Sequence, residues 1–354
     1  MFNVDSNGLN SNLQKKTGLC YKGLKLVSVP EIPANRAIFK IAGLLALAGL
    51  LTGCAALPKD ASIESVNYRA CLVTDGDALR PGLADSSVFS LNQAVVTFGI
   101  KKKIIESNPS KFETTIQDFV KSKCSFIAVV GSRFTQFVQP AVEANPATHF
   151  LFITDGSDQA LLAANLENLA VYRVDVYEAG LLAGHLAASA STTHQLVVGC
   201  RGAVNAEYLD GLRAGASSFD AEAKTSTSVN SSSALLVDPD VLLVYGCRDE
   251  IPSDPENLKQ FKLVGYGRDL FFDPALEIAK PNVLATIIPQ AGPRFFEAIA
   301  ADLESEFIGG TLGSTVASYG NGGLIISEEH LIALPTGELE KLKGLAEEYE
   351  MTFK

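Results

Sequence analysis

The sequence contains no tryptophan, two methionines and four histidines among its 354 residues. None of the histidines is grouped with cysteines at the spacing of metal ligands, so we expect no metal site. The nucleophile elbow, the phosphate-binding loop and the dinucleotide fingerprint are also missing, and with them the usual motifs of hydrolases, nucleotide-dependent enzymes and oxidoreductases. We therefore expect a protein that is not an enzyme and that uses no cofactor.

Positive charge is scarce as well. The chain has 29 Lys and Arg residues against 40 Asp and Glu residues, which gives a formal net charge of −11. This excess of negative charge argues against nucleic acid, and against an anionic membrane surface, as a partner. The one basic cluster, Lys101-Lys102-Lys103, is expected to be a solvated loop and not a binding patch.

A long apolar run is the third absence. The uncharged run 41–51 is about eleven residues long, whereas a membrane-spanning helix needs roughly 20. Arg36 and Lys40 precede the run, and Leu51-Thr52-Gly53-Cys54 closes it, in the order of charged, apolar and cleavage regions of a secretory signal. The closing sequence resembles a bacterial lipobox, in which the cysteine is acylated; a buried apolar helix with a fortuitous cysteine is the alternative.

The signal interpretation divides the N-terminal part of the chain. We predict that residues 1–53 are a leader and signal peptide, that acyl chains on Cys54 hold the protein at the extracytoplasmic face of the cell membrane, and that residues 54–65 are a tether. Because the leader is unusually long and polar for a signal, we expect translation to start downstream of Met1, at a codon such as Val27 or Val29.

Apolar runs of strand length alternate with helix-like segments in the rest of the chain. Continuous apolar strands with helices between them indicate the α/β class, with parallel sheets covered on both faces. In such sheets ligands bind beyond the carboxyl ends of the strands. The runs are 70–75, 126–131, 149–155, 169–174, 195–200, 240–246, 261–267 and 282–288, and the clearest helical segments are 133–145, 176–190 and 206–219.

The pattern restarts near residue 195, which favours two similar lobes over one large sheet. We expect residues 66–174 and 262–288 in lobe 1, and residues 175–261 and 289–335 in a pruned lobe 2. Residues 336–354 are expected to form a C-terminal helix.

One segment carries a specific motif. Within "NLAVYRVDVYEAGLLAGHLAA" (168–188), residues 178–184 read Glu-Ala-Gly-Leu-Leu-Ala-Gly. Together with segments 71–89, 128–156, 197–216 and 282–299, this motif resembles the basic membrane protein family of ABC-transporter substrate-binding lipoproteins, which includes bacterial purine nucleoside receptors. We expect the glycines of the motif to let the helix pack closely on a sheet.

The resemblance implies a type I periplasmic-binding fold, in which two Rossmann-like lobes on a hinge close on a small ligand and deliver it to ABC permease subunits. The expected function is therefore that of a lipid-anchored solute-binding protein of an ABC importer, with a nucleoside-like ligand. A degenerate member that acts as an interaction or sensory lipoprotein at the envelope is the alternative, and a nucleoside hydrolase is a distant third.

The resemblance also implies ligand-binding residues. Asp75 and Asp155 end the first and fourth strands, where the family uses carboxylates, and Asp77 is able to substitute for Asp75. A carboxylate there can accept hydrogen bonds from sugar hydroxyls or a base N–H; capping of the next helix is the alternative. Phe89 stands near the family's ring that stacks on the base, with an apolar helix face as the equal alternative.

The chain departs from the family at other positions. Gly267 replaces the carboxylate that grips ribose, Asp269 remains nearby, and Pro289 stands where the family has a lysine. Arg248 and Arg268 are candidate replacements that would favour an anionic or carbonyl-rich ligand. Surface arginines without a ligand are the alternative.

Four cysteines remain after export into an oxidising compartment. Cys71 and Cys124 begin the first and third strands, which should be neighbours in a sheet of order 2-1-3, and Cys200 and Cys247 end the corresponding strands of lobe 2. Neighbouring strands can bring cysteines within bridging range. We therefore expect the disulfides Cys71–Cys124 and Cys200–Cys247, with buried free thiols as the alternative.

Overall fold

The computed structural model describes most of the chain after residue 66. The described residues are 67–75, 82–156, 158–199, 204–228, 239–245, 258–267, 269–327, 334 and 336–353, all within one compact unit, residues 60–354. Within these ranges no helix combines the length and the apolar character that crossing a bilayer requires. The predictions for Cys54, Asp77, Cys200, Cys247, Arg248 and Arg268 lie outside the described residues.

The first sheet has the strand order β11-β5-β4-β3-β1-β2, and its neighbouring strands are all parallel. Its central strands are buried except at His149 and Arg173, which explains their nearly continuous apolar sequences. The strands are β1 (Arg69–Thr74), β2 (Lys101–Glu106), β3 (Phe126–Val130), β4 (His149–Thr154), β5 (Leu169–Val174) and β11 (Thr315–Ala317).

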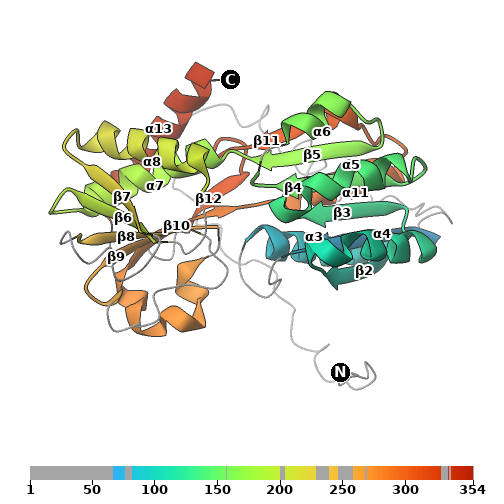
Figure 1. Cartoon of the computed structure of the whole chain (residues 1–354), viewed down its shortest axis with the longest axis horizontal. Coiled ribbons are helices and arrows are strands. Elements are labelled where there is room, and N and C mark those ends of the chain that lie inside the picture. Colours follow the sequence, from blue (N-terminus) through green and yellow to red (C-terminus); the bar gives the residue numbers. More distant parts are fainter. Residues whose placement is uncertain are drawn as a thin grey trace, which may run out of the picture. The chain divides into compact units, whose positions relative to one another are not determined.

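Helices cover both faces of this sheet (Figure 1). On one face α3 (Leu83–Phe98) and α11 (Gly292–Leu303) pack side by side, and Phe295 of α11 stacks on Phe126 of β3. On the other face α4 (Phe112–Lys121) and α5 (Thr135–Glu143) enclose a second apolar cluster. The 3-10 helices η1 (Pro109–Lys111) and η2 (Ser132–Phe134) and the short helices α6 (Gln159–Ala164) and α12 (Gly310–Gly313) complete the lobe.

The second sheet has the order β12-β10-β9-β8-β6-β7, and only β12 runs antiparallel to its neighbour. Its strands are β6 (Gln195–Gly199), β7 (Lys224–Ser228), β8 (Val241–Tyr245), β9 (Lys262–Tyr266), β10 (Val283–Pro289) and β12 (Leu324–Ile326). The associated helices are α7 (Val176–Ala190), α8 (Ala206–Phe219), the 3-10 helices η4 (Leu270–Phe272) and η5 (Pro274–Asn282), and α13 (Glu338–Phe353). Two lobes with mostly parallel α/β sheets confirm the predicted fold class.

Close packing of α7 and α8 explains the glycine-rich motif. Gly180 and Gly184 of α7 face Gly211 and Gly215 of α8, and a Cβ atom on Gly184 would lie 2.0 Å from the backbone oxygen of Leu212. All four glycines would meet backbone of the opposite helix in this way. We expected these glycines to let α7 pack closely on a sheet. That expectation is wrong, because the glycines of α7 lie against the backbone of α8.

In the part of the chain that the structure describes, three segments cross between the sheets, at 174–176, 289–292 and 317–324. The predicted lobe boundaries are wrong for the late part of the chain. Residues 262–288 supply β9 and most of β10 of the second sheet, and the segment 289–335 returns α11, α12 and β11 to the first lobe before β12 re-enters the second. Local apolar patterns show where strands lie but not in which sheet they pair, so the crossings were missed.

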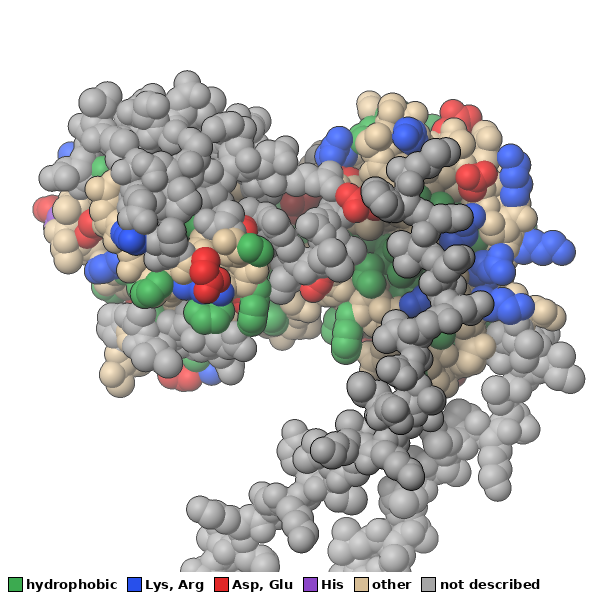
Figure 2. All heavy atoms as spheres, turned by 90° about the horizontal axis from the view of Figure 1, so that it is seen from below, with side chains coloured by type: hydrophobic (Ala, Val, Ile, Leu, Met, Phe, Trp, Pro, Cys, Tyr) green, Lys and Arg blue, Asp and Glu red, His purple; other side chains and the backbone are tan. Residues whose placement is uncertain are grey.

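The basic cluster belongs to an edge strand. Lys101, Lys102 and Lys103 lie in β2, which pairs only with β1 in the sheet order, so the expectation of a loop is wrong. Exposed lysines on an edge strand oppose pairing with another chain. Figure 2 shows Lys and Arg side chains gathered on the lobe that carries this sheet, although the chain as a whole is acidic.

The structure contains the expected disulfide between Cys71 and Cys124. Their Cα atoms lie 5.9 Å apart, and 53 residues separate them in sequence. Cys71 lies inside β1, whereas Cys124 stands two residues before β3. The bridge therefore joins two neighbouring strands of the first sheet, in the predicted order β2-β1-β3.

Candidate functional site

Asp75 and Asp155 each follow a buried strand of the first sheet, as predicted. Asp75 comes directly after β1 and Asp155 directly after β4, and β3 lies between these strands. With strands spaced about 4.8 Å apart, the two backbones are roughly 10 Å apart at the same edge of the sheet. Neither residue is the N-cap of the next described helix, because Gly82 precedes α3 and Asp158 precedes α6.

Small residues occupy the space between the two aspartates. Gly131 follows β3 with a φ of 123°, and a Cβ atom there would lie 2.1 Å from Oδ1 of Asp75. A Cβ atom on Gly156 would lie 2.7 Å from the side chain of Ser132. Glycines at these positions let the carboxylate of Asp75 lie against the end of β3.

The corresponding edge of the second sheet carries tyrosines. Tyr245 and Tyr266 are the last residues of β8 and β9 and pair in register, with ring centroids 5.4 Å apart and rings inclined by 23°. The ring of Tyr208 in α8 contacts both, with its centroid 4.7 Å from that of Tyr245 and 5.0 Å from that of Tyr266. We call Tyr208, Tyr245 and Tyr266 the tyrosine cluster.

The tyrosine cluster is electrostatically connected to the first lobe. Burial raises the pKa of Tyr245 and Tyr266 far above the ordinary value, and the negative charge of Asp155 raises both further. These phenols are therefore protonated at neutral pH. The hydroxyl of Tyr266 is buried and has no hydrogen-bond partner among the described residues.

Contacts between the lobes join the two edges. The side-chain amide of Asn205, the N-cap of α8, donates to the backbone oxygen of Asp155 at 3.4 Å. A Cβ atom on Gly82, before α3, would lie 2.8 Å from the backbone oxygen of Gly267, after β9. The carboxyl ends of the two sheets thus face each other across a narrow space.

An ion pair also crosses this space. Arg173, near the end of β5, lies 3.5 Å from Asp158 in its own lobe and 3.9 Å from Glu207 of α8. Burial raises the pKa of Asp158, and the positive charge of Arg173 opposes that shift. Because Arg173 is engaged by two carboxylates, the described part of the site is acidic and favours a neutral or cationic ligand rich in hydrogen-bond donors.

Asp269 lies at the carboxyl end of the second sheet but is already engaged. It is buried, accepts a hydrogen bond from the backbone N–H of Phe271 at 3.0 Å, and accepts a second from the hydroxyl of Ser327, also at 3.0 Å. It therefore caps η4 and ties it to the end of β12, and its contact with a ligand stays a prediction.

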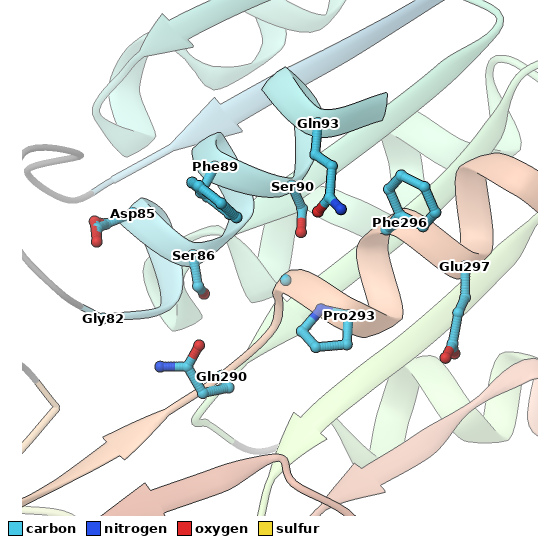
Figure 3. Close-up of a pocket in the computed structure, with 11 residues that line it drawn as sticks. Gly82, Asp85, Ser86, Phe89, Ser90, Gln93, Gln290, Pro293, Phe296 and Glu297 are labelled. Carbon is cyan, nitrogen blue, oxygen red and sulfur yellow. The ribbon is translucent and has the colours of Figure 1, made fainter. Parts of the chain in front are cut away.

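Phe89 lies apart from the aspartates. Its ring is 70% exposed and lines a cavity of about 540 Å³ between the N-terminal parts of α3 and α11 (Figure 3). Phe89, Pro293 and Phe296 supply apolar walls. The full lining is Gly82, Asp85, Ser86, Phe89, Ser90, Gln93, Gln290, Gly292, Pro293, Phe296 and Glu297, and it includes none of Asp75, Asp155 and Asp269.

Sequence reasoning missed the tyrosine cluster and Arg173. A signal was present, because the two runs "DVLLVYG" and "FKLVGYG" both end in Tyr-Gly, at 245–246 and 266–267. Arg173 is likewise the one charged residue in the apolar run "LAVYRV". Polar groups that end parallel strands belong to the edge where ligands bind.

The described residues contain no group of three or more histidines, cysteines or acidic residues arranged to hold a metal ion.

Comparison with known proteins agrees with the fold and the motifs. Residues 73–233 match the Bmp family, described as ABC transporter substrate-binding protein PnrA-like. This segment belongs to the Bmp family. The Bmp match contains Asp75, Asp155 and the α7–α8 glycines, but ends before Tyr245 and Tyr266. It supports a solute-binding role for the protein.

Solved structures share the fold at low sequence identity. A protein described as an ABC transporter system solute-binding protein from Conexibacter woesei has a TM-score of 0.63 at 13% identity, over 80% of this chain and 97% of its own. An ABC transporter solute-binding protein from Aeropyrum pernix has a TM-score of 0.58 at 14% sequence identity, and the match covers 81% of this chain and 86% of that protein. A transcriptional activator of the comK gene from Bacillus halodurans has a TM-score of 0.61 at 16% sequence identity, and the match covers 81% of this chain and 99% of that protein. No curated protein matches the chain by sequence.

Proposed function

We propose that the protein is the lipid-anchored solute-binding component of an ABC importer and that its ligand is nucleoside-like. The Bmp match and the two-lobed fold support the solute-binding part of this proposal. In a protein of this kind the lobes close on a small molecule and present it to permease subunits.

One observation carries the choice of ligand. Carboxylates follow two strands of the first sheet, and protonated tyrosines end two strands of the second, with Asp155 close enough for its charge to act on Tyr245 and Tyr266. Carboxylates accept hydrogen bonds from hydroxyls and N–H groups, whereas phenol hydroxyls donate hydrogen bonds to ring nitrogens and carbonyl oxygens. A nucleoside-like molecule offers both kinds of group.

The anchoring part of the proposal rests on the lipobox-like sequence and on the disulfide. Cys71–Cys124 is a bridge typical of exported proteins. Cys54 is the proposed acylation site, at the extracytoplasmic face of the membrane. Labelling of cells with a radioactive fatty acid should mark the protein, and Cys54→Ala should abolish the label and release the protein from membranes.

Ligand titration by calorimetry tests the binding proposal. The purified protein is titrated with purine and pyrimidine nucleosides, free bases and sugars, and the same titrations are repeated with Asp155→Asn. Loss of a charge-assisted hydrogen bond worth about 1.5–3 kcal/mol should weaken nucleoside binding by roughly 10- to 150-fold.

Asp210→Asn is the matched control, because this side chain is 65% exposed on α8 and pairs with Arg213. It should leave the affinity unchanged. Binding of another class of solute would keep the transport proposal and replace the ligand. Absence of binding to every solute would favour an envelope interaction or sensory lipoprotein. The loss of family side chains at Gly267 and Pro289 is consistent with that alternative.

A further inference from the structure

The hydroxyl of Tyr266 is unusual among the described tyrosines. Its side chain is 2% exposed, and its oxygen has no hydrogen-bond partner within the described residues. The hydroxyl of Tyr68 bonds to Asp302, that of Tyr172 donates to the backbone oxygen of Gln290 at 2.8 Å, and that of Tyr349 donates to Asp175 at 3.2 Å. A buried hydroxyl without a partner is costly and calls for a specific explanation.

Tyr266 stands where a parallel sheet binds ligands. It is the last residue of β9, in a central position of its sheet, and Gly267 follows it with a φ of 97° at the contact with Gly82. Rings of Tyr208 and Tyr245 hold the Tyr266 ring from two sides, so its orientation is fixed without the hydroxyl.

The groups around Tyr266 decide which part its hydroxyl can play. The charged groups that act on it are Asp155 of the first lobe and Asp175 at the N-cap of α7, both carboxylates, and the other neighbours are two phenols. Burial and these carboxylates raise the pKa of Tyr266, so its hydroxyl keeps its proton. It can therefore donate a hydrogen bond, and no acceptor lies within reach among the described residues.

We propose that the Tyr266 hydroxyl donates a hydrogen bond to a ring carbonyl oxygen of a bound heterocycle, while Asp155 accepts from the N–H or hydroxyl groups of the same molecule. This inference rests on the proposed function and specifies its substrate class: neutral, planar molecules with a ring carbonyl. Phosphorylated forms are disfavoured, because the carboxylates of Asp75, Asp155 and Asp158 would repel the phosphate.

Entry of the ligand requires the lobes to separate. Among the described residues, three contacts join the edges: the Asn205 hydrogen bond, the Arg173–Glu207 pair at 3.9 Å and the backbone contact of Gly82 with Gly267. Such exposed or long contacts contribute little energy, so opening is accessible and brings Tyr266 to the ligand.

Tyr266→Phe tests the inference, because it removes the hydroxyl and keeps the ring. Calorimetric titration compares inosine, which has a ring carbonyl, with purine riboside, which has none. Wild-type protein should bind inosine about tenfold more tightly than purine riboside, and Tyr266→Phe should lose this difference by weakening inosine alone. Inosine 5′-monophosphate should bind at least about tenfold more weakly than inosine.

Thermal unfolding without ligand separates a binding role from a structural one. Tyr266→Phe should unfold at the same temperature as wild type or higher, since it removes an unpaired buried hydroxyl. Tyr68→Phe is the control: its hydroxyl bonds to Asp302 at the opposite end of the first sheet, so it should lower the unfolding temperature and leave inosine affinity unchanged.

Each other outcome overturns a defined part of the account. Nucleoside binding that Tyr266→Phe does not change would overturn the inference and leave the proposed function. An unfolding temperature lowered as in Tyr68→Phe would show that the hydroxyl is structural. Absence of binding by wild-type protein to all nucleosides would overturn the nucleoside proposal and this inference together.

Discussion

The two lobes offer different chemistry to the same space. In the first lobe, β1 and β4 are followed by Asp75 and Asp155, whose carboxylates can accept hydrogen bonds, with glycines between them. In the second, β8 and β9 end in Tyr245 and Tyr266, which are protonated and aromatic. Under the proposed function, hydrogen-bond acceptors lie on one lobe and hydrogen-bond donors on the other, so a ligand contacts both only when the lobes close.

The family match divides the chain in nearly the same way. The matched segment 73–233 includes the aspartates, whereas both strand-end tyrosines lie beyond it. By the resemblance, Gly267 stands in the second lobe where the family has a carboxylate, and Pro289 stands where it has a lysine. The aspartate side therefore lies within the family match, and the tyrosine side lies outside it.

The lobes also differ in how they are stabilised. The largest loss of stability is expected from removing the disulfide of the first lobe. Replacing both Cys71 and Cys124 by serine removes a bridge that spans 53 residues. The free energy of unfolding should fall by about 2–4 kcal/mol, because the unfolded chain gains conformational freedom. Denaturant unfolding with and without reductant measures this loss. Equal sensitivity of the double variant and the wild type to reductant would contradict it.

The second lobe should break at its glycines. Gly184→Ala places a Cβ atom 2.0 Å from the backbone oxygen of Leu212, so α7 and α8 must move apart, at a cost of about 1–3 kcal/mol. Gly344→Ala in α13 is the matched control, since no atom lies within 4 Å of its new Cβ. It should stabilise the protein by about 0.5–1 kcal/mol. Equal effects of the two substitutions on urea unfolding would refute the close packing.

Acid should weaken the attachment of α13 to the second lobe. His185 of α7 lies 2.9 Å from the buried carboxylate of Glu338, and burial lowers its pKa although Glu338 acts in the opposite direction. The unfolded state therefore takes up a proton near pH 6.5, before the folded state does, and stability should fall as the pH is lowered from about 6.5.

Comparison of His185→Gln with wild type isolates this contribution. The exposed His194 has a pKa raised by its hydrogen bond to Asp220 and acts in the opposite sense, but it is present in both proteins. The variant should lose part of the decline in stability between pH 6.5 and pH 5. An unchanged pH profile would show that the pair does not titrate in this range.

The smallest effect is expected at the pair that joins the lobes. Arg173→Met removes contacts of 3.5 and 3.9 Å to Asp158 and Glu207. Partly exposed ion pairs contribute under about 1 kcal/mol, so stability should change little. The ligand-free lobes should open more readily, which small-angle scattering detects as a larger radius of gyration; an unchanged radius with a large loss of stability would contradict the assignment.

Much of the fold was predictable because its central strands are continuously apolar. All eight predicted runs are strands, and the helices at 176–190 and 206–219 have the expected bounds. The missed strands lie at sheet edges, where no two-sided burial forces an apolar sequence: β2 is rich in lysine, β7 reads "KTSTS", and β11 and β12 have three residues each.

The candidate site residues were predictable only where a charged group directly follows an apolar strand. Asp75 and Asp155 were found because a carboxylate after an apolar strand stands out. Tyr266 was missed because tyrosine is also an ordinary residue of a core, and its proposed role rests on a hydroxyl without a partner among the described residues, which no sequence shows. Exchange of the late segments between lobes was missed for the same reason, since pairing is decided by tertiary structure.

The most direct test of a ligand held between aspartates and tyrosines is a double-mutant cycle on inosine affinity with Asp155→Asn and Tyr266→Phe. We predict that each single variant weakens binding, by roughly 10- to 150-fold and about tenfold respectively, and that both leave the folded protein intact. Full wild-type affinity in both single variants would contradict the account, because the ligand would then bind elsewhere.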